Sequence, residues 1–375
     1  MLSVQSRGPN LERGGPIPVI EASVVHRNNA VSAWSITCDG NDPRVQAFQE
    51  GWGVLIQDGD WWVSGPAIEI EDDHSAASDE WTVTIRGVSD ETVLDDMVTI
   101  PNPAQGATGT GTDLWKASGP AETVILRLVD EQIGPSAPAD YRVPNLVLSP
   151  NQARGANVSV STRFRNLLEE VQEQASAGGL LFRVAQDGAQ IRLSFSEGRD
   201  LTRAVRLTRA NGGVGGAKLT RTAPTVTEAI VGGVGSGATR KMWRVAHDTA
   251  PWGRRVTRFV DRQSTADENE LQQAAEQELE GGQAKSSVTF DANDLPHLKF
   301  GRDFTIGDTI TVGMGGDAIV SDVLQIADVR WTASGRDVRL QVGPVADESK
   351  LNQASGELVA LVKKLSQQTR LLQTR

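Results

Sequence analysis

The sequence has a single cysteine, Cys38, among its 375 residues. No disulfide can form within one chain, so folding in a reducing compartment such as the cytoplasm is the simplest expectation. No apolar run approaches the roughly 20 residues that a membrane-spanning helix needs. The polar residues 1–15 also lack the apolar core of a signal peptide. The sequence therefore predicts a chain without a disulfide, a membrane span or a signal peptide.

Clustered basic charge is also missing. The chain carries 48 Asp and Glu against 37 Lys and Arg, a net charge of −11, and has no long basic run. Proteins that bind nucleic acid gather Lys and Arg to neutralise phosphates. We therefore expect no sequence-specific nucleic-acid binding. An acidic balance suits a soluble protein that must not adhere to passing DNA.

Residues that carry metal or nucleophilic chemistry are few and scattered. The four histidines are His26, His74, His247 and His297; none lies at metal-ligand spacing from another, and no H-E-x-x-H motif occurs. Cys38 lies in an alternating strand pattern, which favours packing over a nucleophilic role. We expect no catalytic residue, no cofactor and no metal, although a metal site assembled from distant residues stays open.

Two glycine-rich segments, residues 231–240 and 212–218, are candidates for phosphate-binding loops. Such a loop needs G-K-[ST] at the start of a helix, so that backbone N–H groups and a lysine face the phosphates. In the first segment no lysine follows Gly237 and a strand pattern comes next; in the second, Ala217 separates glycine from lysine and Leu219 replaces Ser or Thr. Flexible hairpin loops are the better interpretation.

Two acidic clusters and a tryptophan pair are the remaining candidates. The clusters, residues 69–73 and 39–42, could hold Ca²⁺ or hydrolyse a glycoside, but neither has the twelve-residue calcium-loop pattern. Solvated loops are expected there instead. Trp61 and Trp62 are adjacent, so in a strand they point to opposite faces. One of them is therefore expected in a core, and at most one on a sugar-binding surface.

What the sequence has in abundance is short strands separated by turns, with 38 glycines as punctuation. Two apolar runs around Asp58-Gly59-Asp60 predict a hairpin. Helical spacing predicts helices over residues 90–97, 121–134, 161–177 and 264–280. Ser161 or Thr162 is expected to cap the third helix, and Thr265 with Glu268 matches a capping box for the fourth.

The pattern as a whole predicts a mainly β fold with two barrel-like β domains around an α/β module, followed by a C-terminal helix. The expected divisions are an N-terminal arm (1–16), a first barrel-like domain (17–103), the α/β module (104–200), a second β-rich domain with one helix (201–346) and the final helix (347–375).

The final helix carries a heptad seam. Leucines recur seven residues apart, and two further apolar residues widen the stripe: Leu351, Leu358, Leu361, Val362, Leu365 and Leu372. A seam this short is marginal as an isolated helix. It predicts either a multi-chain coiled coil or a helix that docks on its own domain.

Several stretches follow one another in a recognisable order, among them "VTIRGVSDETVLDDMVTIPNP", "TAPTVTEAIVGGVGSGATR" and "FGRDFTIGDTITV". Their order resembles that in the minor tail proteins of long-tailed actinobacterial phages and, more broadly, in baseplate hub proteins. The resemblance runs from about Ile17 to Pro344. Each short motif alone is weak, and their order carries the likeness.

The resemblance implies a structural hub at the virion tail tip, assembled in the host cytoplasm. Hubs of this kind are homotrimers whose two barrel-like domains per chain adapt a six-fold tail tube to a three-fold tip around the DNA exit channel. Implied partners are a distal tail or tail tube protein, the tape measure protein, and tail fibre or tip proteins.

Two other functions stay open. One is a carbohydrate-binding adhesin that uses exposed tryptophan. The other is a cell-wall hydrolase that uses carboxylates such as Asp72 and Asp73, although some hub relatives carry such an activity in a further domain for which this sequence shows no counterpart.

Overall fold

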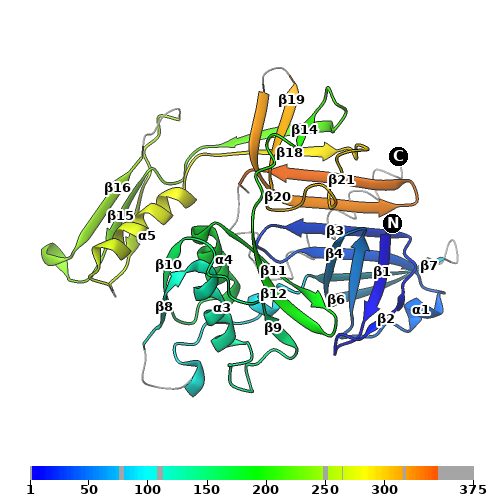
Figure 1. Cartoon of the computed structure of the whole chain (residues 1–375), viewed down its shortest axis with the longest axis horizontal. Coiled ribbons are helices and arrows are strands. Elements are labelled where there is room, and N and C mark those ends of the chain that lie inside the picture. The colour runs from blue at the N-terminus through cyan, green and yellow to red at the C-terminus, as the bar shows by residue number, and fades with distance from the viewer. Residues whose placement is uncertain are drawn as a thin grey trace. The chain divides into compact units, whose positions relative to one another are not determined.

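A computed structural model describes residues 2–75, 80–107, 113–247, 252–263, 265–315 and 318–344. Strands predominate and helices are few (Figure 1), which confirms the expected mainly β fold with an α/β insert. The described residues form two compact units. The larger unit contains residues up to Ala217 together with Thr289–Val342, and the smaller is built around Lys218–Val288. Among the described residues, no helix has the length and apolar character needed to cross a bilayer.

One large sheet takes strands from segments far apart in the sequence. Across the sheet the order is β14 (Val214–Thr222), β18 (Lys285–Ala292), β21 (Gly335–Val342), β20 (Ala318–Thr332), β3 (Glu21–Arg27), β4 (Ala33–Asp39), β7 (Glu80–Val88), β6 (Trp61–Ser75), β5 (Gly53–Asp58), β1 (Leu2–Arg7) and β2 (Arg13–Pro16). Strand β19 (Thr309–Gly315) pairs with β20 and with β13 (Arg206–Thr208). The short helix α1 (Pro43–Gln46) follows β4.

The two separate barrels expected from the sequence are not present. Strand β3 pairs antiparallel with β20, which joins the expected first and second β domains in one sheet. Within the described residues the path from β2 to β14 stays open. The expectation was wrong because alternation and turn signals report pairing between sequence neighbours, whereas closure depends on strands far apart in the chain.

Strand β6 forms a corner of this sheet. Its residues 61–66 pair with β5, and residues 67–75 pair with β7. A side chain at Gly65 would place its Cβ 1.8 Å from the carbonyl oxygen of Val88, so the corner requires glycine. Figure 1 shows β1 and β2 crossing β3 and β4 at a steep angle, as in orthogonal sheet packing. The interior contains fully buried Trp34, Ile56 and Ile85.

The segment before residue 17, expected as an arm, carries strands instead. Residues of β1 pair one to one with β5, and β2 adds to β1. Val4 in β1 is buried. The hairpin between β5 and β6 has the predicted turn, since Asp58 pairs with Trp61 across Gly59 and Asp60.

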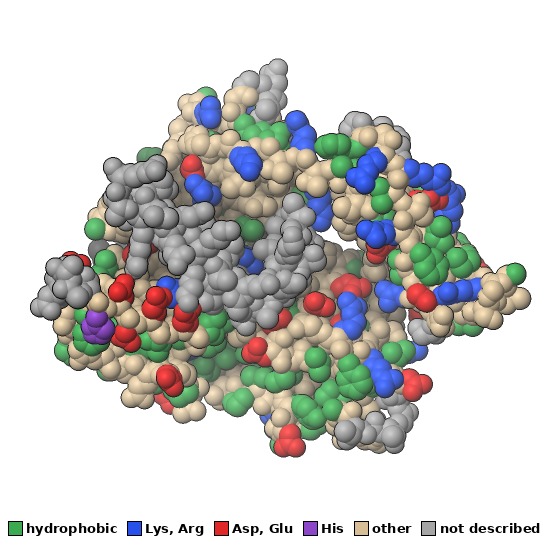
Figure 2. Space-filling model, turned by 180° about the vertical axis from the view of Figure 1, so that it is seen from behind, with side chains coloured by type: hydrophobic (Ala, Val, Ile, Leu, Met, Phe, Trp, Pro, Cys, Tyr) green, Lys and Arg blue, Asp and Glu red, His purple; other side chains and the backbone are tan. Residues whose placement is uncertain are grey.

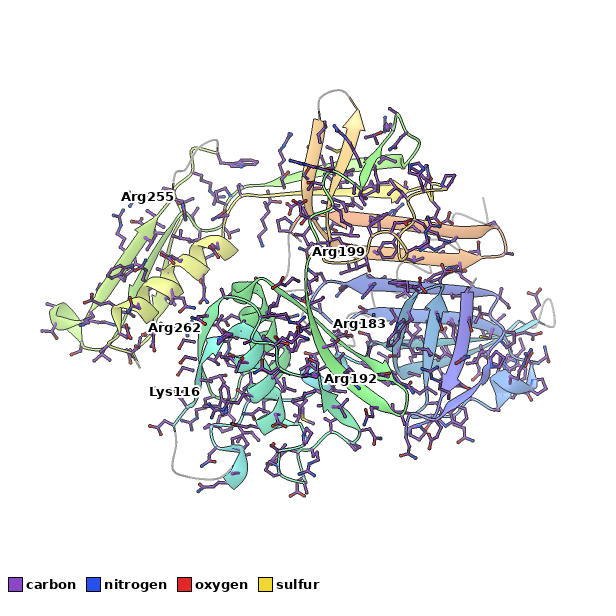
Figure 3. The ribbon with its side chains drawn as sticks, viewed as in Figure 1. Lys116, Arg183, Arg192, Arg199, Arg255 and Arg262 are labelled. Atoms are coloured by element: carbon purple, nitrogen blue, oxygen red, sulfur yellow. The ribbon has the colours of Figure 1, made fainter. Side chains whose placement is uncertain are left out.

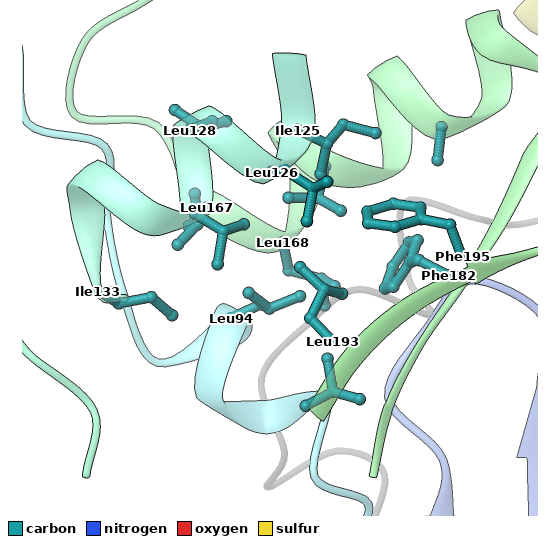
Figure 4. Packing of buried hydrophobic residues seen from close by; sticks show 14 of the residues in the cluster. Leu94, Ile125, Leu126, Leu128, Ile133, Leu167, Leu168, Phe182, Leu193 and Phe195 are labelled. Atoms are coloured by element: carbon teal, nitrogen blue, oxygen red, sulfur yellow. The ribbon is translucent and has the colours of Figure 1, made fainter. Parts of the chain in front are cut away.

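The α/β insert packs two helices on short strands. Its elements are α2 (Thr92–Asp95), the 3-10 helix η1 (Pro103–Gln105), β8 (Trp115–Pro120), α3 (Ala121–Gln132), β9 (Leu146–Leu148), β10 (Asn157–Thr162), α4 (Leu167–Gly178), β11 (Leu180–Asp187) and β12 (Gln190–Glu197). Figure 4 shows their shared core, in which Ile125 of α3, Leu167 of α4 and Leu193 of β12 are fully buried. The stripe predicted for residues 121–134 therefore faces this core.

Three helices, α2, α4 and α5 (Glu268–Gly281), begin later than predicted. Helix α4 begins at Leu167 and is capped by Asn166, whose side chain accepts a hydrogen bond from the N–H of Glu169. The expected caps Ser161 and Thr162 lie instead in β10. Polar residues at the end of a strand and at the start of a helix look alike in sequence, and here the strand takes them.

The smaller unit is a three-stranded sheet with one helix. Strand β15 (Glu228–Gly232) lies between β16 (Met242–Ala246) and β17 (Thr257–Asp261), and the 3-10 helix η2 (Gly237–Thr239) lies in the β15–β16 connection. Helix α5 (Glu268–Gly281) is capped by Asp267, not by the predicted Thr265–Glu268 box.

Candidate assembly surface

Helix α5 covers one face of the smaller unit's sheet. Leu271, Ala275 and Leu279 of the helix are buried against Ala229 and Val231 of β15. Because successive strand residues point to opposite faces, the alternate residues of these strands face away from the helix. The other face of this sheet is not covered by α5 and is therefore the candidate binding surface of the smaller unit.

The helix-free face carries an apolar row across all three strands. Ile230 of β15 is paired with Phe259 of β17, and Gly232 is paired with Met242 of β16. Met242 is 52% exposed and Phe259 is 53% exposed. Figure 2 shows hydrophobic side chains beside Lys and Arg side chains on this unit. Large apolar side chains that are exposed on a strand face are more typical of a surface that binds another protein than of a surface that faces only water.

A buried carboxylate lies beside this row and is surrounded by arginines. Glu228 is 3% exposed, and its Oε2 atom accepts from Thr257 Oγ1 at 2.7 Å and from Arg255 Nη2 at 2.6 Å. Arg244 donates to its other oxygen. The hydrogen bonds from Thr257, Arg255 and Arg244 lower the pKa of Glu228 to about 2. The carboxylate therefore stays ionised and fixes two exposed guanidinium groups on this face; Arg255 is labelled in Figure 3.

A third arginine is held at the other end of the row. Arg240 donates to the carbonyl oxygens of Gly232 and Gly233, both at 2.9 Å, and pairs with Asp261. Its guanidinium carbon lies 5.4 Å from the centre of the Phe259 ring, within cation–π range. This face thus combines aromatic, methionine and arginine side chains, the types enriched in protein interfaces.

The glycine-rich segment 231–240 is part of this unit and forms the β15–β16 connection. Its only helical turn is η2, of three residues, and β16 follows, so the segment does not build a phosphate site. The segment 212–218 likewise leads into β14. Residues 233–240 thus connect β15 to β16 as the predicted hairpin loop, whereas the loop predicted for 212–218 is wrong over residues 214–218, which belong to β14.

The larger unit holds a polar network in its interior. Arg7 of β1 forms a salt bridge with Asp90 at 2.8 Å, and both side chains are almost wholly buried. Ser64 donates to Asp90 at 2.5 Å and accepts from the N–H of Gln186 at 2.9 Å. Glu91, next in sequence, accepts from the N–H of Val184. The network ties β1 and β6 to β11 of the α/β insert.

A small polar cavity borders this network. His26, Ser64, Glu91 and Arg183 are among its lining residues, and Arg183 is labelled in Figure 3. Its size suits about one water molecule. Burial, with a smaller contribution from the positive charge of Arg183, lowers the pKa of His26 to about 3. The cavity is small and polar, which fits a structural role.

The tryptophan pair lies as the strand pattern predicts. Trp61 is buried, donates from its indole nitrogen to Nδ1 of His26 at 3.1 Å, and contacts Phe300 and Trp331. Trp62 lies on the other face of β6, with the Arg183 guanidinium 4.2 Å from its ring centre. The two rings therefore do not form a shared sugar-stacking platform.

Of the remaining single-residue candidates, Cys38 and His74 make packing contacts, and His247 and His297 are exposed. Cys38 is fully buried in β4, and burial raises the pKa of its thiol to about 12, which confirms packing over nucleophilic reactivity. His74 stacks on Trp81 with ring centres 4.9 Å apart. Within the described ranges, no three or more His, Cys, Asp or Glu side chains gather as metal ligands would.

The acidic clusters are tied to local structure. Residues 69–73 lie in β6, where Glu69 and Glu71 form salt bridges with Arg86. Asp42 caps α1 and also pairs with Arg44. Asp72 accepts from the indole of Trp81. The first cluster is thus in a strand and not in the loop that the sequence suggests.

The heptad residues Leu351 to Leu372 lie outside the described residues, so the seam stays a prediction. The apolar and arginine-lined face of the smaller unit was missed from the sequence. One signal was visible: residues 264–280 contain six Asp or Glu and no Lys or Arg, whereas residues 218–263 contain nine Lys or Arg and three Asp or Glu.

Comparisons with known proteins agree on one fold. The family model of Siphovirus ReqiPepy6 Gp37-like proteins matches residues 11–344. The 43 kDa tail protein of prophage MuSo2 from Shewanella oneidensis is similar in structure, with a TM-score of 0.59 and 10% identity over 91% of this chain and 98% of that chain. The tail protein from Neisseria meningitidis MC58 gives 0.57 and 12%, over 92% and 96%. Prophage tail protein gp18 from Listeria monocytogenes EGD-e gives 0.52 and 10%, over 97% and 99%.

No curated protein matches the chain. Identities of 10 to 12% show a shared fold and leave the function to be argued separately.

Proposed function

Because the chain belongs to the family of Siphovirus ReqiPepy6 Gp37-like proteins, we propose that it is a structural protein of a phage tail, assembled as a homotrimeric baseplate hub. The predicted resemblance to siphophage proteins agrees with this family. In the proposed role the chain works by assembly at the tail tip and catalyses no reaction.

The observation that carries the proposal is the extent of the structural likeness. The MuSo2 tail protein matches across 91% of this chain and 98% of its own. The shared architecture therefore includes the large sheet, the α/β insert and the smaller unit, and is not limited to one common motif. Such an extensive likeness supports a tail role more than a single strand pattern does.

The finer role draws on the sequence resemblance. We propose that three chains surround the DNA exit channel and adapt a six-fold tail tube to a three-fold tip. Its proposed neighbours are a distal tail or tail tube protein, the tape measure protein, and tail fibre or tip proteins, and assembly takes place in the host cytoplasm. The net charge of −11 suits a ring past which DNA must move without adhering.

Imaging of the virion tests this role. A cryo-electron microscopy reconstruction of the tail should contain three copies of the chain at the tip, beside the end of the tube. Tails that assemble normally in a phage lacking the gene would contradict a hub role. Three copies placed away from the tube end would contradict the proposed location.

Neither alternative gains support from the described residues. A sugar-binding adhesin would use neighbouring exposed tryptophans, but Trp61 is buried, and of the tryptophans that the structure describes only Trp252, at 45%, is exposed. A cell-wall hydrolase would use Asp72 and Asp73, which lie in β6 beside Trp81. A zymogram of the chain on host cell wall should show no clearing. The chain should also bind no sugar on a glycan array.

A further inference from the structure

We propose that the helix-free sheet face of the smaller unit docks onto the acidic outer face of α5 in a neighbouring copy of the chain. This inference rests on the proposed homotrimer and names the surfaces that would join its subunits. Its basis is that one small unit presents two opposite faces of complementary character.

The first face supplies apolar area at its centre. Ile230, Met242 and Phe259 form the row described above, and the two larger side chains are about half exposed. Interfaces have an apolar centre rich in aromatic and methionine side chains, surrounded by polar groups. Burying this row against another protein surface would remove from water the exposed hydrophobic side chains that this sheet face carries.

The rim of this face is basic and held in place. Arg244 and Arg255 are fixed by Glu228, and Arg240 is fixed by backbone carbonyls. Arginines already ordered by internal hydrogen bonds lose little side-chain freedom on binding, which favours a carboxylate partner. The partner should therefore present Asp or Glu in several positions.

The second face presents that chemistry. Gln272, Glu276 and Glu280 follow one another at helical spacing on α5 and are exposed, while Leu271, Ala275 and Leu279 face the sheet. Of the six acidic residues of 264–280, Asp267 caps α5 and Glu268 pairs with Lys241 at 3.5 Å, whereas Glu270, Glu276 and Glu280 are exposed on the helix. A helix face of this kind can meet a basic rim with several carboxylates at once.

The chemistry of this face favours a protein over a nucleic acid as the occupant. Phosphate-binding surfaces are basic throughout, whereas this face has an apolar centre at Met242 and Phe259 and includes the carboxylates of Glu228 and Asp261. Since one copy gives the sheet face and the next gives the helix, the contact is heterologous. Contacts of this type repeat from copy to copy and close into a ring when the rotation between copies permits.

Charge exchange in the full-length chain tests the contact. Met242→Glu places an acid in the sheet face, and the double variant Glu276→Lys, Glu280→Lys makes the helix face basic. Each change should raise the dissociation constant of the trimer by about tenfold or more, as for central interface residues. Combining the three substitutions should restore association to near that of the unmodified chain, as measured by analytical ultracentrifugation.

Ile20→Glu is the matched control, because Ile20 is 54% exposed and belongs to the larger unit. It should leave association unchanged, and circular dichroism should show all variants folded. If the unmodified chain is trimeric and every variant stays trimeric, the docking surfaces are wrong while the hub survives. If the unmodified chain is monomeric at all concentrations, both proposals fail. If Met242→Glu weakens binding to a duplex oligonucleotide and leaves association unchanged, the face takes nucleic acid and the inference is wrong.

Discussion

Arg7 and Asp90 place opposite charges in the interior of the larger unit, where each depends on the other for compensation. Removing one partner of a buried pair leaves an unpaired charge out of contact with water. Asp90 also accepts from Ser64, so the loss would reach the hydrogen bond that Ser64 makes with Gln186. At the scale of single residues, this pair should be among the most sensitive positions in the chain.

We expect Asp90→Ala to lower the free energy of unfolding by about 3 to 5 kcal/mol. Urea denaturation of the full chain measures this loss of stability as a lower urea midpoint for unfolding of the larger unit. The exposed pair Arg192 with Asp187 provides the control, and Asp187→Ala should cost at most about 1 kcal/mol. Equal losses in the two variants would contradict the distinction.

His26 gives a prediction about pH. Its pKa in the folded chain is about 3, against an ordinary value of 6.5. Between these two values the unfolded chain binds a proton that the folded chain does not, so stability from His26 is present above pH 6.5 and is lost as pH falls toward 3. The loss is at most about 1.4 kcal/mol for each pH unit.

The variant His26→Gln removes this titration. The unfolding free energy should therefore depend less steeply on pH between about 6 and about 4 in the variant than in the unmodified chain. Burial raises the pKa of Glu91 in both proteins, so its contribution cancels in the comparison. Parallel pH curves for the two proteins would show that His26 does not titrate as described.

Sequence patterns predicted single residues well where the cause was local. The opposite faces of Trp61 and Trp62 follow from strand geometry, and the burial of Cys38 follows from its alternating neighbours. The Arg7–Asp90 pair was beyond such reasoning, because its members lie 83 positions apart and neither stands in a pattern that marks burial. The Glu228 cluster was missed because Arg244 comes from β16 and Arg255 from the loop before β17, so that neither is near Glu228 in sequence.

Helix caps show how elements are defined by their ends. Asn166 accepts from the N–H of Glu169 and donates to the carbonyl oxygen of Asp95 at 2.7 Å, so it both starts α4 and ties it to α2. Ser161, which the sequence suggested as the cap, is an exposed residue of β10. The two positions therefore allow a direct comparison.

Replacing Asn166 with Ala should cost about 1 to 2 kcal/mol, because the first turn of α4 loses its acceptor. The matched variant Ser161→Ala should change stability by less than about 0.5 kcal/mol. The midpoint of denaturant unfolding measures the stability of both variants, provided that the unfolding free energy depends equally steeply on denaturant concentration in each. A larger loss of stability in Ser161→Ala than in Asn166→Ala would show that Ser161 caps the helix, as the sequence suggests.

Element types were largely predictable, and element partners were not. The hairpin at Asp58–Trp61 and the stripe of α3 depend on residues close in sequence, so their periodicity was sufficient. The barrel expectation failed at the pairing of β3 with β20, for which no local signal exists. The starts of α4 and α5 were placed too early because several capping residues lie near each start.

For the whole molecule, the heptad seam beyond the described residues predicts how copies associate. If residues 347–375 form a coiled coil, a chain ending at Pro344 should form trimers more weakly, and so should Leu358→Lys with Leu365→Lys. Gln367→Lys lies off the seam and should leave association unchanged. Analytical sedimentation of the unmodified chain and the three variants measures their association. If the shortened chain or the leucine variant loses thermal stability but associates normally, the helix docks on its own domain.

The pairing of β3 with β20 has a consequence for biosynthesis. Asn28, at the end of β3, donates to Gln325, 297 positions later in the chain. At about 5 to 20 residues per second, a ribosome would need on the order of 15 to 60 s to deliver the second strand after the first. During that interval one edge of β3 stands without its final neighbour. The nascent protein is therefore exposed to mispairing and to host chaperones for much of its own synthesis, and slowed translation near residues 318–332 should lower the yield of soluble chain.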